Sequence, residues 1–137
     1  MDKLEFESMT LCPLDGRYGK IKDQLADYFS EYALVKYRVF VEIQWLKFQL
    51  DHLHTETLDK VDPISKDFNF DSFKRIKEIE SVTRHDVKAV EYFIDEKLKT
   101  LGYEHLESYV HIGCTSEDIN NTSYACMIKH GLKDVWL

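Results

Sequence analysis

The chain has 137 residues, of which 44% are apolar, so it can form one folded domain around a hydrophobic core. Asp and Glu number 25 against 18 Lys and Arg, and no stretch concentrates the basic residues. This balance argues against general nucleic-acid binding through phosphates and against adhesion to an anionic membrane. An anionic ligand would therefore need a local binding site.

Further features of the sequence argue against secreted, zinc-binding and membrane proteins. The 3 cysteines are an odd number and show no CxxC or Cys/His metal spacing. The N-terminus, Met1–Thr10, is polar and acidic, unlike a signal peptide. The longest apolar region, 34–50, is interrupted by charged residues, so we do not expect it to cross a bilayer. These features predict a cytoplasmic protein with no metal and no membrane partner.

The chain contains only 5 Gly and 2 Pro, which favours helices over a many-turned β domain. Residues Ser30–Leu53 are predicted as a long helix with two apolar stripes. One stripe consists of Leu34, Tyr37, Val41, Trp45 and Phe48, and the other of Val35, Val39, Ile43, Leu46, Leu50 and Leu53. Burial on two sides is typical of a helical bundle or an oligomer, so we expect a further partner surface here.

A polar connection over Thr55–Phe70 precedes two more predicted helices. We expect Asp71 to cap the first, which ends near Val82. Thr83–Asp86 has the spacing of a capping box, with Thr at the N-cap and Asp at N3. The second helix opens there, and Gly102 is suited to end it. Apolar residues at helical spacing support these helices: Phe73, Ile76 and Ile79 in the first, and Val87, Val90, Ile94, Leu98 and Leu101 in the second.

Thr115–Asp118 is a second capping box and opens a last helix over Ile119–Leu137. Gly131 lies inside this helix and costs about 1 kcal/mol relative to Ala, so the extent of the helix is less well determined than its start. The expected apolar face consists of Tyr124, Met127, Ile128, Leu132 and Val135. The sequence as a whole predicts an all-α fold.

Asp15–Gly19 places an arginine and a tyrosine between two glycines on a loop. Arg17 could present its guanidinium to a phosphate or a carboxylate there. The same residues also fit an ordinary turn with a solvated Arg17 and a half-buried Tyr18. These residues alone leave both interpretations open.

Two predicted helix starts carry polar residues that could do chemistry. Arg84–Asp86 combines free backbone N–H groups with a cation, which favours an anion, and His85 could move a proton at neutral pH. The hydroxyls of Thr115 and Ser116 suit a carboxylate at the next helix start. Both sites can equally be helix caps, with an exposed histidine in the first. Cys114 fits a small buried residue better than a nucleophile, because no base lies beside it in sequence.

Four segments in this order closely resemble the N-terminal part of the adenylosuccinate lyase family. The resemblance extends from Leu11 to Lys129, and four such strings in register are far more specific than any one of them. The segments are Cys12–Gly19, Phe29–Leu34 followed by Lys36 and Arg38, Thr83–Phe93, and His111–Asn121.

The resemblance implies an all-helical homotetramer of the fumarase/aspartase superfamily that acts in cytoplasmic purine biosynthesis, including AMP biosynthesis. It implies a β-elimination that splits adenylosuccinate into AMP and fumarate, and the succinylated aminoimidazole carboxamide ribotide in the same way. No metal or organic cofactor is implied.

The resemblance also assigns roles to residues of this sequence. Arg17 and Tyr18 would hold the nucleotide. Arg84, His85 and Asp86 would line the phosphate and leaving-group side, where His85 either donates a proton or only binds. Thr115 and Ser116 would grip the succinyl carboxylates.

The sequence departs from the family in length. The family's second histidine and its mobile Gly-Ser-Ser-x-Met-Pro loop with a catalytic serine do not occur in these 137 residues. We therefore expect a helical N-terminal domain over 1–110 and the truncated start of a central helical bundle over 111–137, without activity on its own. The alternatives are a non-catalytic helical interaction module, or another lyase of the superfamily that acts on argininosuccinate or fumarate.

Overall fold

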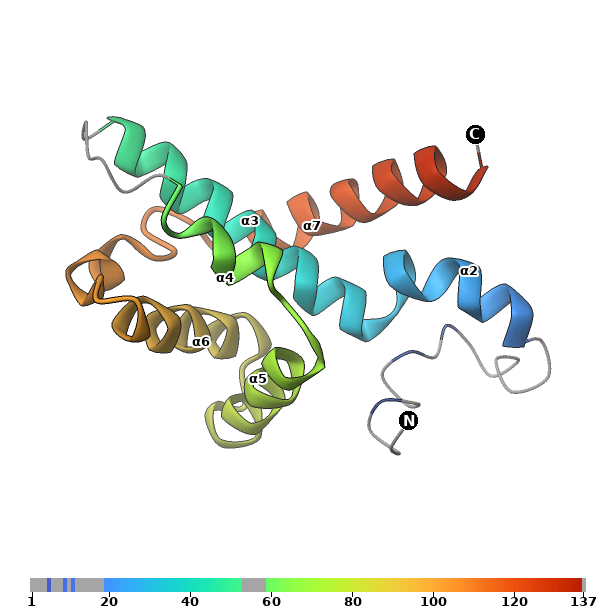
Figure 1. Ribbon diagram of the computed structural model, residues 1–137, viewed down its shortest axis with the longest axis horizontal. Coiled ribbons are helices and arrows are strands. Elements are labelled where there is room, and N and C mark those ends of the chain that lie inside the picture. Colours follow the sequence, from blue (N-terminus) through green and yellow to red (C-terminus); the bar gives the residue numbers. More distant parts are fainter. Residues whose placement is uncertain (1–4, 6–8, 10, 12–18, 53–58, 137) are drawn as a thin grey trace.

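The computed structural model describes residues 5, 9, 11, 19–52 and 59–136. Within these ranges the regular structure is helical, without a strand, which confirms the all-α prediction (Figure 1). The elements are α2 (Gly19–Phe29), α3 (Glu31–His52), α4 (Asp62–Lys66), α5 (Phe70–Thr83), α6 (Asp86–Thr100), the 3₁₀ helix η1 (Glu104–Tyr109), α7 (Ser116–Gly131) and the π-helical turn η2 (Leu132–Trp136). None of the helices in the described part of the chain has the length and apolar character needed to cross a bilayer.

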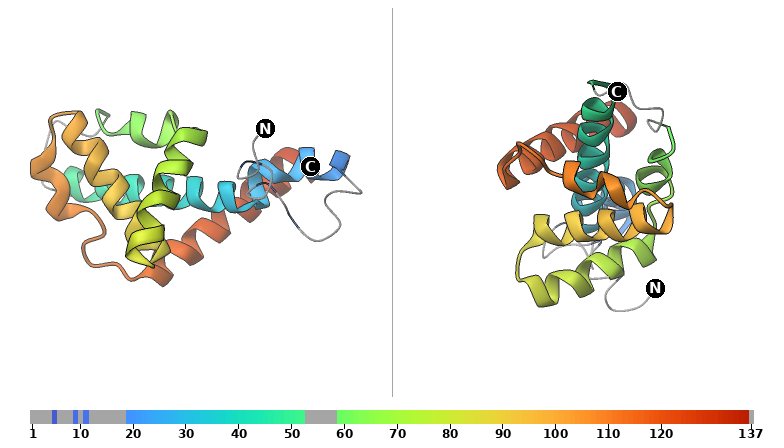
Figure 2. Two further views of the ribbon diagram at one scale, coloured as in Figure 1. Left: turned by 90° about the horizontal axis from the view of Figure 1, so that it is seen from below. Right: turned by 90° about the vertical axis from the view of Figure 1, so that its left-hand side faces the viewer.

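The long helix α3 runs through the middle of the molecule and is covered on two sides (Figures 1 and 2). The helices α4, α5 and α6 contact one side, and α7 crosses the other. The helix α2 precedes α3 and packs beside the C-terminal part of α7 (Figure 2).

The predicted two-stripe pattern of α3 explains this arrangement. All described members of the second stripe are buried and join the main core with α5 and α6. In the first stripe, Tyr37 packs with Met127 and Val41 with Ile119, so α7 of the same chain supplies most of the expected partner surface. Phe48, at the far end of this stripe, stays 53% exposed. Leu53 lies outside the described residues.

The start of α5 differs from the prediction. The N-cap is Asn69, whose side chain accepts hydrogen bonds from the N–H groups of Asp71 and Ser72 at 3.0 and 3.1 Å. The prediction that Asp71 caps the helix is therefore wrong, because Asp71 already lies in the first turn while Asn69 keeps an extended backbone. The end of α5 at Thr83 agrees with the prediction. The preceding connection also contains the short helix α4, which the sequence did not suggest.

The start of α6 also differs. Thr83 still belongs to α5, and Arg84 adopts a left-handed conformation with φ of 55° that ends that helix. The N-cap of α6 is His85, whose Nδ1 accepts from the N–H of Lys88 at 3.1 Å. The predicted capping box is therefore wrong: the carboxylate of Asp86 bonds to α3 and to the next N–H in the chain instead of reaching back to Thr83.

The capping box at Thr115 and Asp118 is confirmed, but the predicted apolar face of α7 is wrong except for Met127. The buried residues of α7 are Ile119, Ser123, Met127 and Gly131, whereas Tyr124, Ile128, Leu132 and Val135 are exposed. Small residues let the neighbouring helices come close. A Cβ at Gly131 would lie 2.6 Å from a ring carbon of Phe29 on α2, so close packing selects this face over the more apolar one.

Candidate functional site

Four residues of α3 form a ridge that binds polar groups from later parts of the chain. We call Arg38, Glu42, Trp45 and Gln49 the α3 polar ridge; their spacing of four, three and four residues places them on one face of the helix. Arg38 bonds to the start of α6 and to α7. The other three bond to the segment 109–112. The ridge therefore holds both the start of α6 and the approach to α7, where candidate residues were predicted from sequence.

Arg38 joins the two helix starts. Its side chain is 7% exposed, and it donates from Nη2 to Asp86 Oδ2 at 2.6 Å and from Nε to Asn120 Oδ1 at 2.9 Å. Burial alone would raise the pKa of Asp86, but the Arg38 guanidinium and the N–H of Val87 outweigh burial and hold it below its ordinary value. Asp86 is thus an ionised anchor for the start of α6.

His85 and Arg84 lie at this anchored start with exposed side chains. Because Nδ1 of His85 accepts the Lys88 N–H, a neutral His85 ring carries its proton on Nε2. The His85 side chain that carries this N–H is 52% exposed. The left-handed Arg84 places a cation beside the N-terminus of α6, where the helix dipole favours an anion.

Thr115 and Ser116 lie at the start of α7. The backbone N–H and the hydroxyl of Thr115 both donate to Asp118 Oδ2, at 2.7 and 2.8 Å, and these bonds lower the pKa of Asp118. Ser116 is half-buried and lies one helical turn before Asn120, on the same face of α7. Since Asn120 accepts from Arg38, Ser116 faces the side of α7 that is tied to the start of α6.

The structure therefore connects the candidates on α6 and α7 through one buried arginine. It brings the start of α6, with Arg84, His85 and Asp86, together with the first turns of α7. Arg17 and Tyr18 lie outside the described residues. In the described part of the chain, no group of three or more His, Cys, Asp or Glu side chains is arranged to hold a metal ion.

His111 and Glu42 were not among the site residues predicted from sequence. Nδ1 of His111 lies 2.6 Å from Glu42 Oε1, and the two side chains are 16% and 0% exposed. Burial raises the pKa of Glu42, hydrogen bonds from His111 oppose the rise, and the charge of Glu91 adds to it. The signal in the sequence was the pair Arg38 and Glu42, two opposite charges one turn apart on a helix expected to be buried on two sides.

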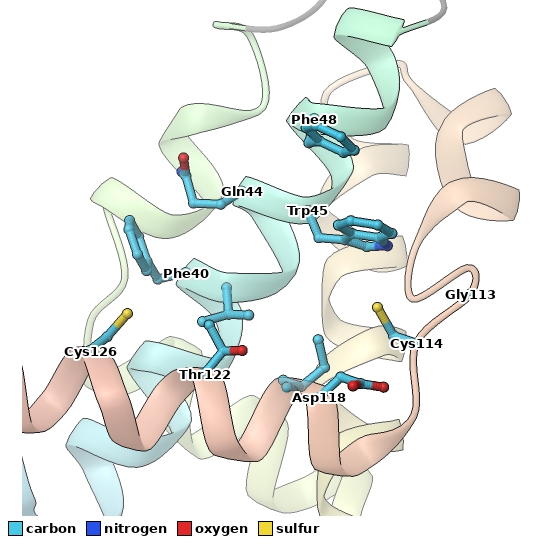
Figure 3. Close-up of a pocket in the computed structure, with 11 residues that line it drawn as sticks. Phe40, Gln44, Trp45, Phe48, Gly113, Cys114, Asp118, Thr122 and Cys126 are labelled. Carbon is cyan, nitrogen blue, oxygen red and sulfur yellow. The ribbon is translucent and has the colours of Figure 1, made fainter.

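A largely apolar groove of about 540 Å³ lies beside these polar residues, between α3 and α7 (Figure 3). Trp45 and Phe48 line one wall, and Cys114 and Thr122 line the other. Burial raises the pKa of the Cys114 thiol, which disfavours the thiolate and agrees with a packing role. A polyanionic ligand does not suit this apolar groove, so we place the candidate site at the two helix starts.

Comparison with known proteins identifies relatives along almost the whole chain. A family model described as lyase matches residues 16–137. Adenylosuccinate lyases from Vibrio cholerae serotype O1 and from Escherichia coli strain K12 are each 42% identical over 98% of this chain and 32% of their own length. The adenylosuccinate lyase of Buchnera aphidicola subsp. Baizongia pistaciae is 41% identical over 93% of this chain and 29% of its own. The chain thus spans about a third of the length of these relatives.

Proposed function

Because this chain belongs to the lyase family, we propose that it is the substrate-gripping N-terminal part of an adenylosuccinate lyase, a carbon–nitrogen lyase. The reaction is the β-elimination of fumarate from adenylosuccinate, which leaves AMP, and from succinylaminoimidazole carboxamide ribotide. This function belongs to purine biosynthesis in the cytoplasm and uses no cofactor.

The observation that carries this proposal is the pairing of two helix N-termini around Arg38. Each N-terminus carries the positive end of a helix dipole, which favours an anion. An acidic protein with a net charge of −7 needs such local positive sites to hold a polyanionic substrate. The relatives are named adenylosuccinate lyase, which supports a nucleotide as the substrate class.

The residues then take the following roles. Arg17 and Tyr18 hold the nucleotide, Arg84 and His85 line the phosphate and leaving-group side, and Thr115 and Ser116 grip the succinyl carboxylates. Asp86 contributes by anchoring the start of α6 to Arg38. This assignment is supported by the exposed positions of Arg84 and His85 at an anchored helix start.

His85 is our candidate proton donor. As the carbon–nitrogen bond breaks, the departing nitrogen takes a proton, and Nε2–H of His85 is the exposed donor at this helix start. A separate base must remove the proton beside the carboxylate, and we assign no residue of this chain to that step. We therefore propose that the chain alone does not turn over substrate.

We further propose that residues 1–110 form the N-terminal domain, that 111–137 begin a central helical bundle, and that the full-length protein is a homotetramer. Apolar residues exposed along α7 and η2 support this assembly: Tyr124, Ile128, Leu132, Val135 and Trp136. We assign no nucleic-acid or membrane partner, since the chain has a net charge of −7.

Calorimetric titration with AMP and adenylosuccinate tests the binding role. We expect Arg84→Ala to weaken binding about tenfold, since one charge-assisted contact is lost. His85→Asn keeps a capping oxygen and should weaken binding without loss of helicity. Lys133→Ala, which removes an exposed cation remote from both helix starts, is the control. Absence of binding by the unaltered chain would refute the proposal.

Fumarate release from adenylosuccinate tests the catalytic part. We expect none from this chain. Release that disappears in His85→Asn would show that the base is present after all, and turnover of argininosuccinate or hydration of fumarate by the same chain would then separate the related lyases.

A non-catalytic helical module is the second candidate, because His85 and Thr115 already act as helix caps. On this interpretation, His85→Ala and Thr115→Ala lower helicity by circular dichroism, and no nucleotide binds. Retained helicity together with weakened nucleotide binding would exclude it.

A further inference from the structure

Glu42 is a buried carboxylate whose position packing does not explain. Its side chain is fully buried in the middle of α3. Oε1 contacts His111, while Oε2 has no hydrogen-bond partner among the described residues. Removing a carboxylate from water is costly, and a well-packed apolar side chain of similar size is often equally or more stabilising. Stability is therefore a weak reason for an acid at this position.

His111 is held in an unusual conformation by the same face of α3. Its φ is 59°, a left-handed conformation that costs a residue other than glycine free energy. Two further ridge residues fix the backbone around it. Trp45 Nε1 donates to the carbonyl of Ile112 at 2.9 Å, and Gln49 Nε2 donates to the carbonyl of Tyr109 at 3.0 Å. The α3 polar ridge thus determines both the backbone and the ring of His111.

The two ring nitrogens of His111 have different surroundings. Nδ1 lies 2.6 Å from Glu42 Oε1, and an ionised Glu42 can only accept there, so a proton on Nδ1 would complete this hydrogen bond. Nε2 lies 3.9 Å from Glu91 Oε1, which is too long for a hydrogen bond. The other oxygen of Glu91 pairs with Lys88 Nζ at 2.7 Å.

We propose that Glu42 is a positioning residue that keeps the proton of His111 on Nδ1, and so makes Nε2 the ring nitrogen that exchanges a proton or a hydrogen bond with a ligand. His111 lies four residues before Thr115, at the approach to α7. The ligand group is a phosphate or carboxylate oxygen of the nucleotide. The identity of the ligand group rests on the proposed function, whereas the role of Glu42 toward His111 rests on the geometry.

Long-range ¹H–¹⁵N spectra of the histidine rings in the labelled chain test the positioning role directly, because the ¹⁵N shifts show which nitrogen holds the proton. The His111 signals are identified by their loss in His111→Gln. In the neutral ring of the unaltered chain we expect the proton on Nδ1 and not on Nε2. In Glu42→Met the proton should distribute over both nitrogens. Glu91→Gln changes the other carboxylate beside the ring and should leave the Nδ1–H form intact.

Thermal unfolding separates positioning from a structural role. We expect Glu42→Met to melt at the same temperature as the unaltered chain or higher. A lower melting temperature with an unchanged Nδ1–H form would overturn the proposal. Should Glu42→Met fail to fold, Glu42→Gln keeps the volume and an acceptor oxygen; it should retain the Nδ1–H form, and a predominantly Nε2–H ring would overturn the proposal.

Titration with adenylosuccinate, which carries both a phosphate and carboxylates, tests the ligand. Relative to Glu91→Gln, we expect Glu42→Met to bind adenylosuccinate about tenfold more weakly, as when one charge-assisted hydrogen bond is lost. Equal affinities alongside a changed tautomer would refute the role of Nε2 toward the nucleotide. A loss that is also seen with AMP assigns the contact to the phosphate, and a loss seen with adenylosuccinate alone assigns it to a carboxylate. If the unaltered chain binds neither nucleotide, the proposed function fails, while the ring spectra still decide the role of Glu42.

Discussion

The two sides of α3 bury opposite kinds of side chain. Toward α4, α5 and α6, the contact is apolar, with Val39, Ile43 and Leu50 fully buried. Toward α7, the 109–112 segment and the first residue of α6, the buried groups include Arg38 and Glu42. We refer to these as the closed side and the polar side of α3.

The residues exposed on the two sides show the reverse pattern: charged pairs on the closed side and apolar side chains on the polar side. On the closed side charged groups pair at the surface, as in the bidentate contact of Arg75 with Glu96. On the polar side apolar residues remain exposed, among them Phe48 and Ile128, each at 53%. Apolar burial stabilises without specifying direction, whereas buried charges fix orientation at a cost in stability. The closed side therefore stabilises the fold, and the polar side positions the candidate site.

The largest difference should come from truncating one phenylalanine on each side. Phe93 is 1% exposed in the closed core, so Phe93→Ala should lower the free energy of unfolding by about 3 to 5 kcal/mol. Phe48→Ala removes a half-exposed ring and should cost about 1 kcal/mol or less. Urea denaturation measures both. Equal losses would show that the two sides do not differ in their contribution to stability.

Arg38→Met should have an intermediate effect. It leaves Asn120 without its donor and Asp86 without its cation, but Asp86 is 45% exposed and can hydrate, so we expect a loss of about 1 to 3 kcal/mol near neutral pH. Folding lowers the pKa of Asp86, which stabilises the folded state at pH values above the pKa that Asp86 has in the unfolded chain. This contribution is lost as the pH falls through the pKa of Asp86 in the folded state. Arg38→Met should therefore also flatten the acid limb of stability against pH.

Urea midpoints across the acid range measure this effect. Arg75→Met removes an exposed arginine from the closed side and is the matched control, for which we expect no measurable change. A similar loss of unfolding free energy in both variants would mean that the effect of Arg38→Met does not depend on the burial of its charge.

Asp95 on α6 is a destabilising group on the closed side. Burial, with the nearby charge of Glu107, raises its pKa to about 6. An acid whose pKa is raised by folding favours the folded state at low pH. This advantage is lost as the pH rises from the pKa of Asp95 in the unfolded chain through its pKa of about 6 in the folded state. Because Asp95 is partly solvated, Asp95→Asn should stabilise by about 1 kcal/mol near neutral pH. Thermal unfolding at several pH values checks this, and a gain that persists in acid would contradict it.

The smallest effect concerns the backbone at Arg84. Its φ of 55° suits glycine, so Arg84→Gly should be about 1 kcal/mol more stable than Arg84→Ala, which keeps the same strain. Both variants lack the cation and should lose AMP affinity equally. A difference between them in affinity would show that the conformation, and not the charge, determines binding.

The sequence by itself determined the helices and the main core. The stripe containing Val39 and Ile43 depends only on spacing along one helix, and the capping box of Thr115 and Asp118 closes within four residues. Such signals are local, so they can be recognised without knowing the rest of the fold. The prediction for the start of α6 was wrong because two residues could cap this helix. The left-handed backbone of Arg84 ends α5 after Thr83 and leaves His85 as the N-cap.

Only the tertiary structure decided how the candidate site is assembled. Arg38 meets Asn120 across 82 positions of the chain, and Glu42 meets His111 across 69. The buried face of α7 was likewise chosen by the close approach of Gly131 to Phe29, and not by apolar content. A periodic pattern shows that a residue is buried but does not show what it is buried against, because that partner is fixed by the packing of distant helices.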